Sequence, residues 1–397
     1  MTKVLIIGGG IAGTATALAL HKAGIDATVY EAHPVSSRDG GAFLTLAANG
    51  MRALHQIEAD TVVAEVGAPL TTMRVCDGDG AELKTVPLGD GDPATGYRYL
   101  TRARLCGALQ QEVQRRGISI QWGKRLISAG QHEGGLTAFF DDGTRARGDL
   151  LIGADGLNST VRTLIDPTAA APRYVGQRVF YGYSADIGLG SAPDCFQVVR
   201  GAAAFGYIVT AQHDIWWFAR VTEDELDRHE LATGCTDRWK DELATLLRQE
   251  LAPTAAIVQA AHQILVTNAY DLPTVGRWHR DGMIIVGDAA HAASPATGQG
   301  ASMALEDTIV LAKALRDRTT LGHHKSLGSR PDHGRVFSTY ERIRRDRVEA
   351  NITTSARMST PNHQHPGPAR QPPAPSRTPG TPDEIVTLQL DWNTPVV

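Results

Sequence analysis

The first 31 residues carry the pattern that most constrains the fold of this 397-residue chain. Residues 4–7 form a short apolar run, and residues 8–13 place three glycines at the spacing GxGxxG. Apolar residues then recur at helical spacing over residues 15–23, and a second apolar run at residues 27–30 ends at Glu31. A strand, a glycine turn, a helix and a second strand in this order predict a βαβ unit with two parallel strands.

Each glycine of the turn has its own physical reason. Gly8 permits the tight turn, Gly10 lets a ligand approach the backbone, and Gly13 lets the helix pack closely on the strand. Glu31 follows about twenty residues later, where a carboxylate can accept hydrogen bonds from a ribose. These features predict a dinucleotide site with a pyrophosphate at the helix N-terminus. An ordinary glycine turn is the weaker explanation, because the whole strand–turn–helix–strand–acid order is present.

A second motif lies near the other end of the chain. The apolar run at residues 283–286 predicts a buried strand, and Gly287 and Asp288 follow it directly. This strand would deliver the Asp288 carboxylate to the carboxyl edge of a sheet. The glycines at residues 298–300 then open a helical pattern that runs from about Met303 to Leu315. The free amide groups at the start of such a helix favour negative charge.

The sequence between these motifs changes its texture. Residues 150–153 predict a third buried strand, which leads to Asp155, whereas residues 174–262 contain alternating, aromatic-rich runs typical of a mixed sheet. We therefore expect an α/β fold, in which a Rossmann-type domain carries an inserted, sheet-rich domain. The expected boundaries are residues 1–70, 97–173 and 275–350 for the first domain and residues 71–96 and 174–274 for the second.

The C-terminal part shows two further patterns. Residues 340–347 combine helical spacing with arginines and interleaved acids, which predicts a solvent-exposed helix face rather than a nucleic-acid patch. Residues 359–397 are rich in proline and have little to bury, so we expect them to form a flexible tail.

Composition excludes several classes of protein. A net charge of −4 argues against general nucleic-acid binding. No apolar run approaches the roughly 20 residues of a membrane span. Because a predicted strand begins directly at the N-terminus, we expect no signal peptide. Four widely spaced cysteines form no CxxC pair, so we expect reduced thiols, no metal site and a cytoplasmic protein, either a monomer or a homodimer.

Three motifs now stand in order: GxGxxG at residues 8–13, Gly-Ala-Asp-Gly at 153–156 and Gly-Asp-Ala-Ala-His at 287–291. This set resembles the class A flavoprotein monooxygenases, the single-component FAD-dependent aromatic hydroxylases. The p-hydroxybenzoate and salicylate hydroxylases belong to this family, as do several antibiotic-tailoring oxygenases. The resemblance covers about residues 1–350, is strong in the flavin domain and weak in the inserted sheet. It implies the GR2-like fold of p-hydroxybenzoate hydroxylase, with FAD as cofactor.

The resemblance also implies roles for single residues. On the adenine side, the implied FAD contacts are the pyrophosphate cradle of Gly8, Gly10, Ala12 and Gly13, the ribose contact Glu31, the phosphate contact Arg102 with Arg104 as its alternative, and the adenine contact Leu126. On the flavin side, they are Arg38, Asp155 with Arg162 for both FAD and NAD(P)H, Asp288 at the ribityl hydroxyls, and Pro295, Gly298, Gly300 and Ala301 beside the isoalloxazine. Arg38 could instead cap a loop, and Asp155 could simply form a turn.

The implied activity is oxygenation. In this family NAD(P)H, a transient co-substrate, reduces the flavin, and dioxygen then adds at its C4a carbon to give a hydroperoxide. This species hydroxylates or epoxidises an aromatic or polycyclic small molecule. Alternatives are a flavin reductase or dehydratase of the same superfamily, or a protein in which structural FAD only templates a binding site. A flavin halogenase is disfavoured, because its WxWxIP motif is absent.

The sequence does not identify a catalytic base. His291 and the region around Pro295 are candidates, although a structural hydrogen bond is the favoured role for His291. Aromatic and histidine side chains of the inserted sheet are candidate pocket residues, and plain core packing is the alternative for each. These residues are Tyr181, Tyr183, His213, Trp216, Trp217 and Phe218.

Overall fold

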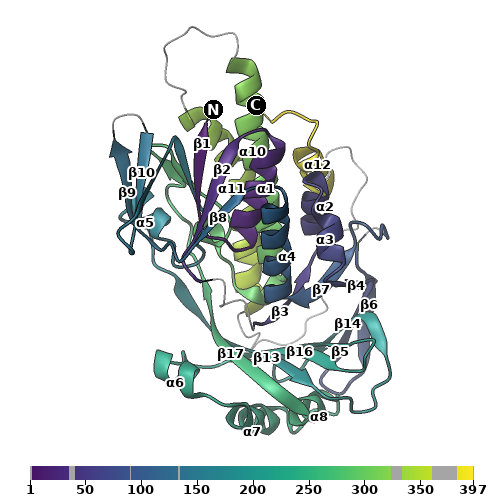
Figure 1. The fold of residues 1–397 in the computed structure, drawn as a ribbon. Helices are drawn as coiled ribbons and strands as arrows, with labels where there is room; N and C mark the ends of the chain where they lie inside the picture. Colours follow the sequence, from purple (N-terminus) through teal and green to yellow (C-terminus); the bar gives the residue numbers. More distant parts are fainter. Residues whose placement is uncertain are drawn as a thin grey trace.

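The computed structural model describes residues 2–34, 41–89, 91–132, 135–322, 333–359 and 382–396. Figure 1 shows two main layers: a six-stranded sheet with long helices beside it, and a seven-stranded sheet that runs across the bottom of the molecule. Strands from widely separated parts of the chain, between residues 3 and 285, meet in the first sheet. The resulting mixed α/β fold agrees with the fold class expected from the sequence.

The six-stranded sheet has the strand order β18-β19-β12-β1-β2-β8. β1 pairs in parallel with both β2 and β12, which confirms the predicted βαβ unit. Val4, Leu5 and Ile6 are fully buried, as expected for parallel strands covered on both faces. The bounds are β1 (Lys3–Ile7), β2 (Asp26–Glu31), β8 (Ser119–Trp122), β12 (Leu150–Gly153), β18 (His279–Arg280) and β19 (Met283–Ile285).

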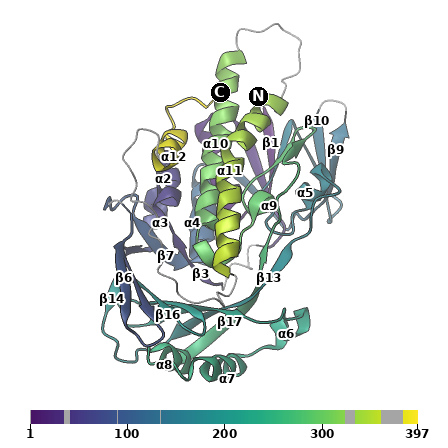
Figure 2. The same ribbon diagram turned by 180° about the vertical axis from the view of Figure 1, so that it is seen from behind.

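Helices cover one face of this sheet. α1 (Ile11–Lys22) packs against α4 (Arg102–Arg115) and α10 (Gly300–Gly322), and α10 lies alongside α11 (His333–Ser359), as Figure 2 shows. α10 begins before Met303 and extends past Leu315, the ends expected from the sequence. No helix in the described ranges has the length and apolar character needed to cross a bilayer.

Two small three-stranded sheets flank the six-stranded sheet. The first has the order β11-β10-β9 and packs on the face away from α1, where the rings of Tyr30 and Phe140 stack at 4.9 Å. The second has the order β3-β7-β4 and leads into short helices. The bounds are β9 (Leu126–His132), β10 (Gly135–Phe140), β11 (Arg145–Gly148), β3 (Phe43–Leu46), β4 (Ala68–Leu70), β7 (Tyr97–Thr101), α2 (Ala48–Gln56), α3 (Asp60–Ala64) and α5 (Thr160–Ile165).

The seven-stranded sheet has the order β17-β13-β16-β15-β14-β5-β6 and so joins an early hairpin to later strands. Its outer face is covered by α7 and α8, which bury Phe180 and Trp217 completely. The aromatic-rich texture therefore did indicate a sheet. The bounds are β5 (Thr72–Asp77), β6 (Glu82–Pro87), β13 (Arg173–Ser184), β14 (Ala192–Arg200), β15 (Ala204–Val209), β16 (Ile215–Thr222), β17 (Ala261–Asp271), α6 (Arg228–Thr233), α7 (Thr236–Leu247) and α8 (Thr254–Gln259).

The end of the chain differs from the sequence prediction of a flexible tail over residues 359–397. Pro382–Leu390 forms α12, which packs on α2 and α10 and buries Val386 and Leu390. Lys313 Nζ of α10 donates to the carbonyl oxygen of Gln389 at 2.6 Å. The prediction is wrong for residues 382–396 because a few apolar side chains spaced along a helix supply the burial that the proline-rich composition concealed.

Candidate functional site

Among the glycines of the turn after β1, only Gly10 has open space beside it. Gly8 has φ +104°, and a Cβ there would lie 2.3 Å from the Ala154 carbonyl oxygen. A Cβ on Gly13 would lie 1.9 Å from the Gly8 oxygen, so both positions require glycine. A Cβ on Gly10 would meet nothing within 4 Å. The turn is therefore packed on one side and accessible on the side where a phosphate would approach.

The N-terminus of α1 faces this open space. Gly10 is the N-cap residue, and no side chain caps the helix. The first amides of a helix have no intrahelical acceptor, so the amides around Ala12 are available to an anion. Gln110 Nε2 of α4 donates to the Gly9 carbonyl oxygen at 2.9 Å and holds the turn from behind.

Glu31 ends β2 directly beside the turn. Its Oε2 accepts the Gly9 amide at 2.6 Å, and its Oε1 accepts the His33 amide at 2.8 Å. Arg102 begins α4. Burial raises the pKa of the Cys106 thiol, and the charge of Arg102 opposes this shift, while Glu31 and the Ile11 backbone act on the same thiol. The amide of Arg104 donates to the Thr101 side chain at 3.2 Å. Both arginine side chains are exposed, so the geometry leaves the choice between them open.

The structure gives less support to two other predicted cofactor contacts, Leu126 on the adenine side and Arg38 on the flavin side. Leu126 begins β9 and is only 5% exposed within the main core, which leaves little of its side chain for an adenine. Arg38 lies outside the described residues.

Asp155 and Arg162 brace two of the motifs against each other. Asp155 accepts hydrogen bonds from Ser159 Oγ at 2.5 Å and from the Val161 amide at 3.1 Å, so it caps the start of α5. Burial raises the pKa of Asp155 and lowers the pKa of Arg162. Arg162 donates to the carbonyl oxygen of Ala289 at 3.1 Å, in the Gly-Asp-Ala-Ala-His segment. A direct contact between Asp155 and a cofactor stays a prediction.

Asp288 lies at the carboxyl edge of the six-stranded sheet, as the sequence predicted. It begins α9 (Asp288–His291), and Gly287 before it has φ +60°. The Asp288 side chain is half-buried, and no residue of the described ranges forms a hydrogen bond or ion pair with its carboxylate. An acid in this position is free to accept hydrogen bonds from ligand hydroxyls.

Asp307 of α10 holds the segment from Gly287 to His291 in place through hydrogen bonds. Its Oδ2 accepts the Gly287 amide at 2.9 Å and lies 2.5 Å from His291 Nε2, and its Oδ1 accepts Arg344 Nε at 2.7 Å. His291 is 4% exposed and so has the structural hydrogen bond that the sequence favoured. Neighbouring Glu306 binds Arg344 Nη1 at 2.5 Å.

The sequence analysis missed this buried ion network. Arg344 is 1% exposed, so the prediction that residues 340–347 form a solvent-exposed face is wrong at this position. Arg344 points from α11 into the contact with α10, and helical spacing alone does not reveal which face of a charged helix is buried. The two adjacent acids at 306 and 307, inside an otherwise apolar helix, were the available signal.

The loop before α10 is held in place from α11. It contains a short 3₁₀ helix, η2 (Pro295–Thr297), and Thr297 Oγ1 donates to Asn351 Oδ1 at 2.9 Å. Gly298 follows with φ +65°, and α10 then begins at Gly300, where a Cβ would meet nothing within 4 Å. The backbone at Gly300 and Ala301 is therefore a second accessible helix N-terminus.

Four of the six aromatic and histidine candidates share the inner face of the seven-stranded sheet, which is turned toward β3 (Figure 1). Tyr181 pairs across the strands with Phe218, and Tyr183 pairs with Trp216. Phe43 of β3 packs on this face, 6.1 Å from the Tyr181 ring and 6.0 Å from the Trp216 ring. All four sheet side chains are only half-buried, so the face is not sealed by its neighbours.

The other two candidates do not join this face. Trp217 points to the opposite side because side chains alternate along a strand, and its Nε1 donates to Ser184 Oγ at 2.8 Å in the outer core. His213 lies in the exposed turn between β15 and β16, with φ +67°, and pairs with Asp186 at 3.8 Å. The structure therefore does not bring either residue to the face that carries the other four candidates.

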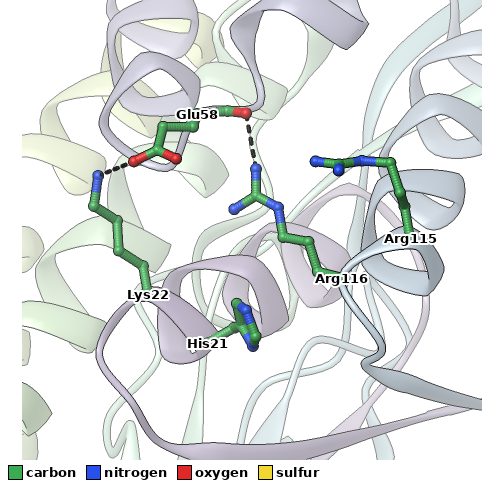
Figure 3. A pocket seen from close by; sticks show the side chains of 5 residues that line it. All are labelled: His21, Lys22, Glu58, Arg115 and Arg116. Carbon is green, nitrogen blue, oxygen red and sulfur yellow. Dashed lines mark hydrogen bonds and ion pairs between the residues drawn. The ribbon is translucent and has the colours of Figure 1, made fainter.

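A separate hollow lies at the far end of α1 from the glycine turn (Figure 3). It has a volume of about 300 Å³ and is lined by His21, Lys22, Glu58, Arg115 and Arg116. Lys22 binds the Glu58 carboxylate at 2.9 Å, and Arg116 donates to the Glu58 carbonyl oxygen. The cations lie at the C-terminal ends of two helices, which favour positive charge, so the hollow needs no ligand to explain it.

The described residues thus bring three of the predicted motifs to one region: the glycine turn, the Asp155 segment and the Asp288 segment. Comparison with known proteins identifies the family of the chain and its cofactor, because the FAD binding domain family matches residues 1–355. The chain belongs to this family. It is an FAD-dependent monooxygenase of the class A type.

Individual relatives of this flavin monooxygenase support the assignment. It is 31% identical over 322 residues to the aurachin C monooxygenase/isomerase of Stigmatella aurantiaca, covering 79% of this chain and 80% of the relative. It is 29% identical over 328 residues to the FAD-dependent urate hydroxylase of Klebsiella pneumoniae, covering 79% and 81%. The crystal structure of Klebsiella pneumoniae HpxO complexed with FAD and uric acid has the same fold, with a TM-score of 0.78 at 24% identity over 90% of this chain and 88% of that one.

Proposed function

We propose that this monooxygenase uses NAD(P)H and dioxygen to hydroxylate or epoxidise an aromatic or polycyclic small molecule. The observation that carries the proposal is the half-buried aromatic face formed by Tyr181, Tyr183, Trp216 and Phe218. Aromatic side chains left partly uncovered opposite a second domain can bind a flat apolar ring. Relatives named for urate and for 6-hydroxynicotinate, both planar rings, support this substrate class.

The described residues fit FAD at both ends of an extended site. The space at Gly10 and the amides around Ala12 suit a pyrophosphate, Glu31 is placed beside them for a ribose, and Arg102 lies near enough to contribute charge. The unpartnered Asp288 carboxylate suits ribityl hydroxyls. We propose that these residues hold FAD, with Gly8 and Gly13 shaping the turn.

Bound FAD supplies the redox chemistry: it takes hydride equivalents from NAD(P)H and reacts with dioxygen. The protein would supply the electrostatic environment. We propose that the loop from Pro295 to Gly298 passes beside the ring system and that the amides at Gly300 and Ala301 face its pyrimidine end. A helix N-terminus there stabilises negative charge on a reduced ring at no cost of reorganisation.

The tyrosines of the aromatic face would act as hydrogen-bond donors, not as bases. Burial raises the pKa of Tyr183 to about 12 and also raises the pKa of Tyr181, so both hydroxyls keep their protons at neutral pH. Tyr183 already donates to the Gly41 carbonyl oxygen at 3.1 Å. His291 is bound to Asp307, so it is not poised to take a proton from a substrate. The surrounding rings of Phe43 and Trp216 would keep water away from the reacting atoms.

We further propose that the enzyme works in the cytoplasm as a monomer or homodimer. The free thiols of Cys76, Cys106, Cys195 and Cys235 and the need for a nicotinamide co-substrate support a reducing compartment.

The proposal is tested by adding FAD to the purified chain and recording its visible spectrum, then screening aromatic and polycyclic compounds for stimulated NADPH or NADH oxidation. We expect a protein-bound flavin spectrum and at least one compound that accelerates oxidation. If flavin binds but no compound accelerates NAD(P)H oxidation, a structural role for FAD would be favoured. If no protein-bound flavin spectrum appears, the proposed FAD site would be refuted.

A further inference from the structure

Arg220 is a buried cation on the inner face of the seven-stranded sheet. It lies on β16, two residues after Phe218, and so points to the same side as the aromatic candidates. Its side chain is 8% exposed, and Nη1 is fully buried without a hydrogen-bond partner. No residue in the described ranges forms an ion pair or a hydrogen bond with it.

This isolation sets Arg220 apart from the other deeply buried arginines. Arg344 binds the carboxylates of Glu306 and Asp307, and Arg162 donates to two backbone carbonyl oxygens. Burial lowers the pKa of Arg220, and the group that opposes this shift is the Tyr181 hydroxyl. A neutral hydroxyl does not balance a guanidinium, which stays protonated even when buried.

A buried charge without a partner costs stability and is retained where something outside the chain compensates it. The immediate cross-strand neighbours of Arg220 are Val179 on β13 and Ala204 on β15, and neither carries a polar side chain. The face of the sheet therefore offers Arg220 no intramolecular acceptor at this position.

On β13, the residues opposite Arg220 lie between two contacts that the inner face makes with other segments of the chain. On one side, Gln177 Nε2 donates to the Ser359 carbonyl oxygen at 2.9 Å, and Ser359 Oγ lies 2.8 Å from Ser294 Oγ, beside the Pro295 loop. On the other side, the Tyr183 hydroxyl donates to the Gly41 carbonyl oxygen. Val179, opposite Arg220, and Tyr181 lie between these anchors on the same side of β13.

We propose that Arg220 is a specificity-determining residue that binds an anionic oxygen of the substrate, with the Tyr181 hydroxyl as a second donor. The proposal rests on the proposed function, since it assigns the substrate class of the same site. It states that the aromatic substrate enters as an anion, through a ring carboxylate or an ionised ring hydroxyl. Both groups present oxygen acceptors of the kind that guanidinium groups bind best.

Binding to the FAD-loaded enzyme tests this directly, with probes followed by their perturbation of the flavin spectrum. Benzoate and 2-naphthoate are compared with their neutral amides, and 4-nitrophenol is titrated across its ionisation. We expect at least one anion to bind about tenfold or more tightly than its neutral counterpart. If the carboxylates bind more tightly than their amides, the site binds a carboxylate oxygen. If 4-nitrophenolate binds more tightly than 4-nitrophenol, the site binds an ionised ring hydroxyl. A panel in which no anion is preferred would overturn the proposal.

Variants separate recognition from fold. Arg220→Gln should remove about 10- to 100-fold of the anion affinity and leave the neutral amides nearly unchanged, and Arg220→Lys should restore part of it. Tyr181→Phe should weaken the anions by about threefold to tenfold. The matched control is Arg74→Gln, an exposed arginine on the opposite face of the same sheet, which should change nothing.

Thermal unfolding keeps the test independent of any probe. Arg220→Met should leave the Tm of the substrate-free holoenzyme unchanged or raise it, because it removes a buried charge without breaking a bond. Arg344→Met should lower the Tm strongly. If Arg220→Met is as damaging as Arg344→Met, or if Arg220→Gln loses FAD together with the anions, Arg220 serves the fold or the cofactor and the proposal fails. A wild-type chain that binds no FAD would instead refute the proposed function.

Discussion

Arg344 Nε donates to Asp307 Oδ1 at 2.7 Å, and both side chains are almost completely buried. The other oxygen of Asp307 accepts a hydrogen bond from the amide of Gly287. Gly287 directly precedes Asp288, the proposed contact of the ribityl chain. The pair thus links α11, through α10, to the segment that follows β19. The geometry at Asp288 depends on a charge pair that does not itself reach the proposed site.

Asp307→Asn should therefore damage both stability and cofactor affinity. It leaves Arg344 with one carboxylate partner fewer, and breaking a buried pair costs about 3–5 kcal/mol. Urea unfolding measures the first effect and FAD titration the second. Asp241→Asn, in an exposed position on α7, is the control. Wild-type stability in Asp307→Asn would contradict the positioning role.

The same carboxylate predicts an acid-sensitive stability. Burial alone would raise the pKa of Asp307, but the charges of His291 and Arg344 lower it from 3.8 to about 2. An acid with a lowered folded pKa contributes stability above its unfolded pKa and loses it as the pH falls through the folded value. Between about pH 4 and pH 2 the wild type should lose about 2 kcal/mol more than Asp307→Asn. Parallel pH slopes in urea unfolding would argue against this.

Two glycines of the same turn should respond differently to alanine. Gly10→Ala places its Cβ in open space at φ −76°, so the fold should keep its Tm while FAD binding weakens by about tenfold or more. Gly13→Ala places its Cβ 1.9 Å from the Gly8 oxygen and should destabilise the protein itself. Tm and FAD dissociation constants are measured for both. Equal loss of stability in the two variants would show that the space at Gly10 is not a ligand site.

Asp288→Ala should weaken FAD binding by about 1.5–3 kcal/mol, because it removes a charged acceptor for the ribityl hydroxyls. The Asp288 carboxylate has no partner within the described ranges, so the apo fold should be unaffected. Asp241→Ala serves as the matched exposed control. The placement would be refuted by a FAD dissociation constant equal to that of the wild type.

Local pattern predicted the backbone of the site well. The turn at Gly8, the strand before Asp288 and the helix at Gly300 each follow from residues within one short segment, where apolar period and glycine position determine the structure. The inner position of Tyr181 follows from strand alternation, and the same rule would have placed Trp217 on the outer face. The sequence analysis did not apply that rule to the pair of adjacent tryptophans.

What the sequence did not predict depends on contacts between distant segments. The burial of Arg344 depends on where α11 meets Glu306 and Asp307, and α12 is ordered because Lys313 and the α2–α10 surface receive it. Composition described residues 340–347 and 359–397 correctly as charged and proline-rich. It could not tell which of those side chains would find a partner.

The most direct test of the central claim is the fate of dioxygen. The FAD-loaded enzyme is incubated with NAD(P)H, ¹⁸O₂ and an aromatic compound that stimulates its oxidation, and the product is examined by mass spectrometry. A monooxygenase with this site inserts one ¹⁸O atom into the product, which should gain the mass of one labelled oxygen. A reduced or dehydrated product without label, or label found only in hydrogen peroxide, would contradict the account.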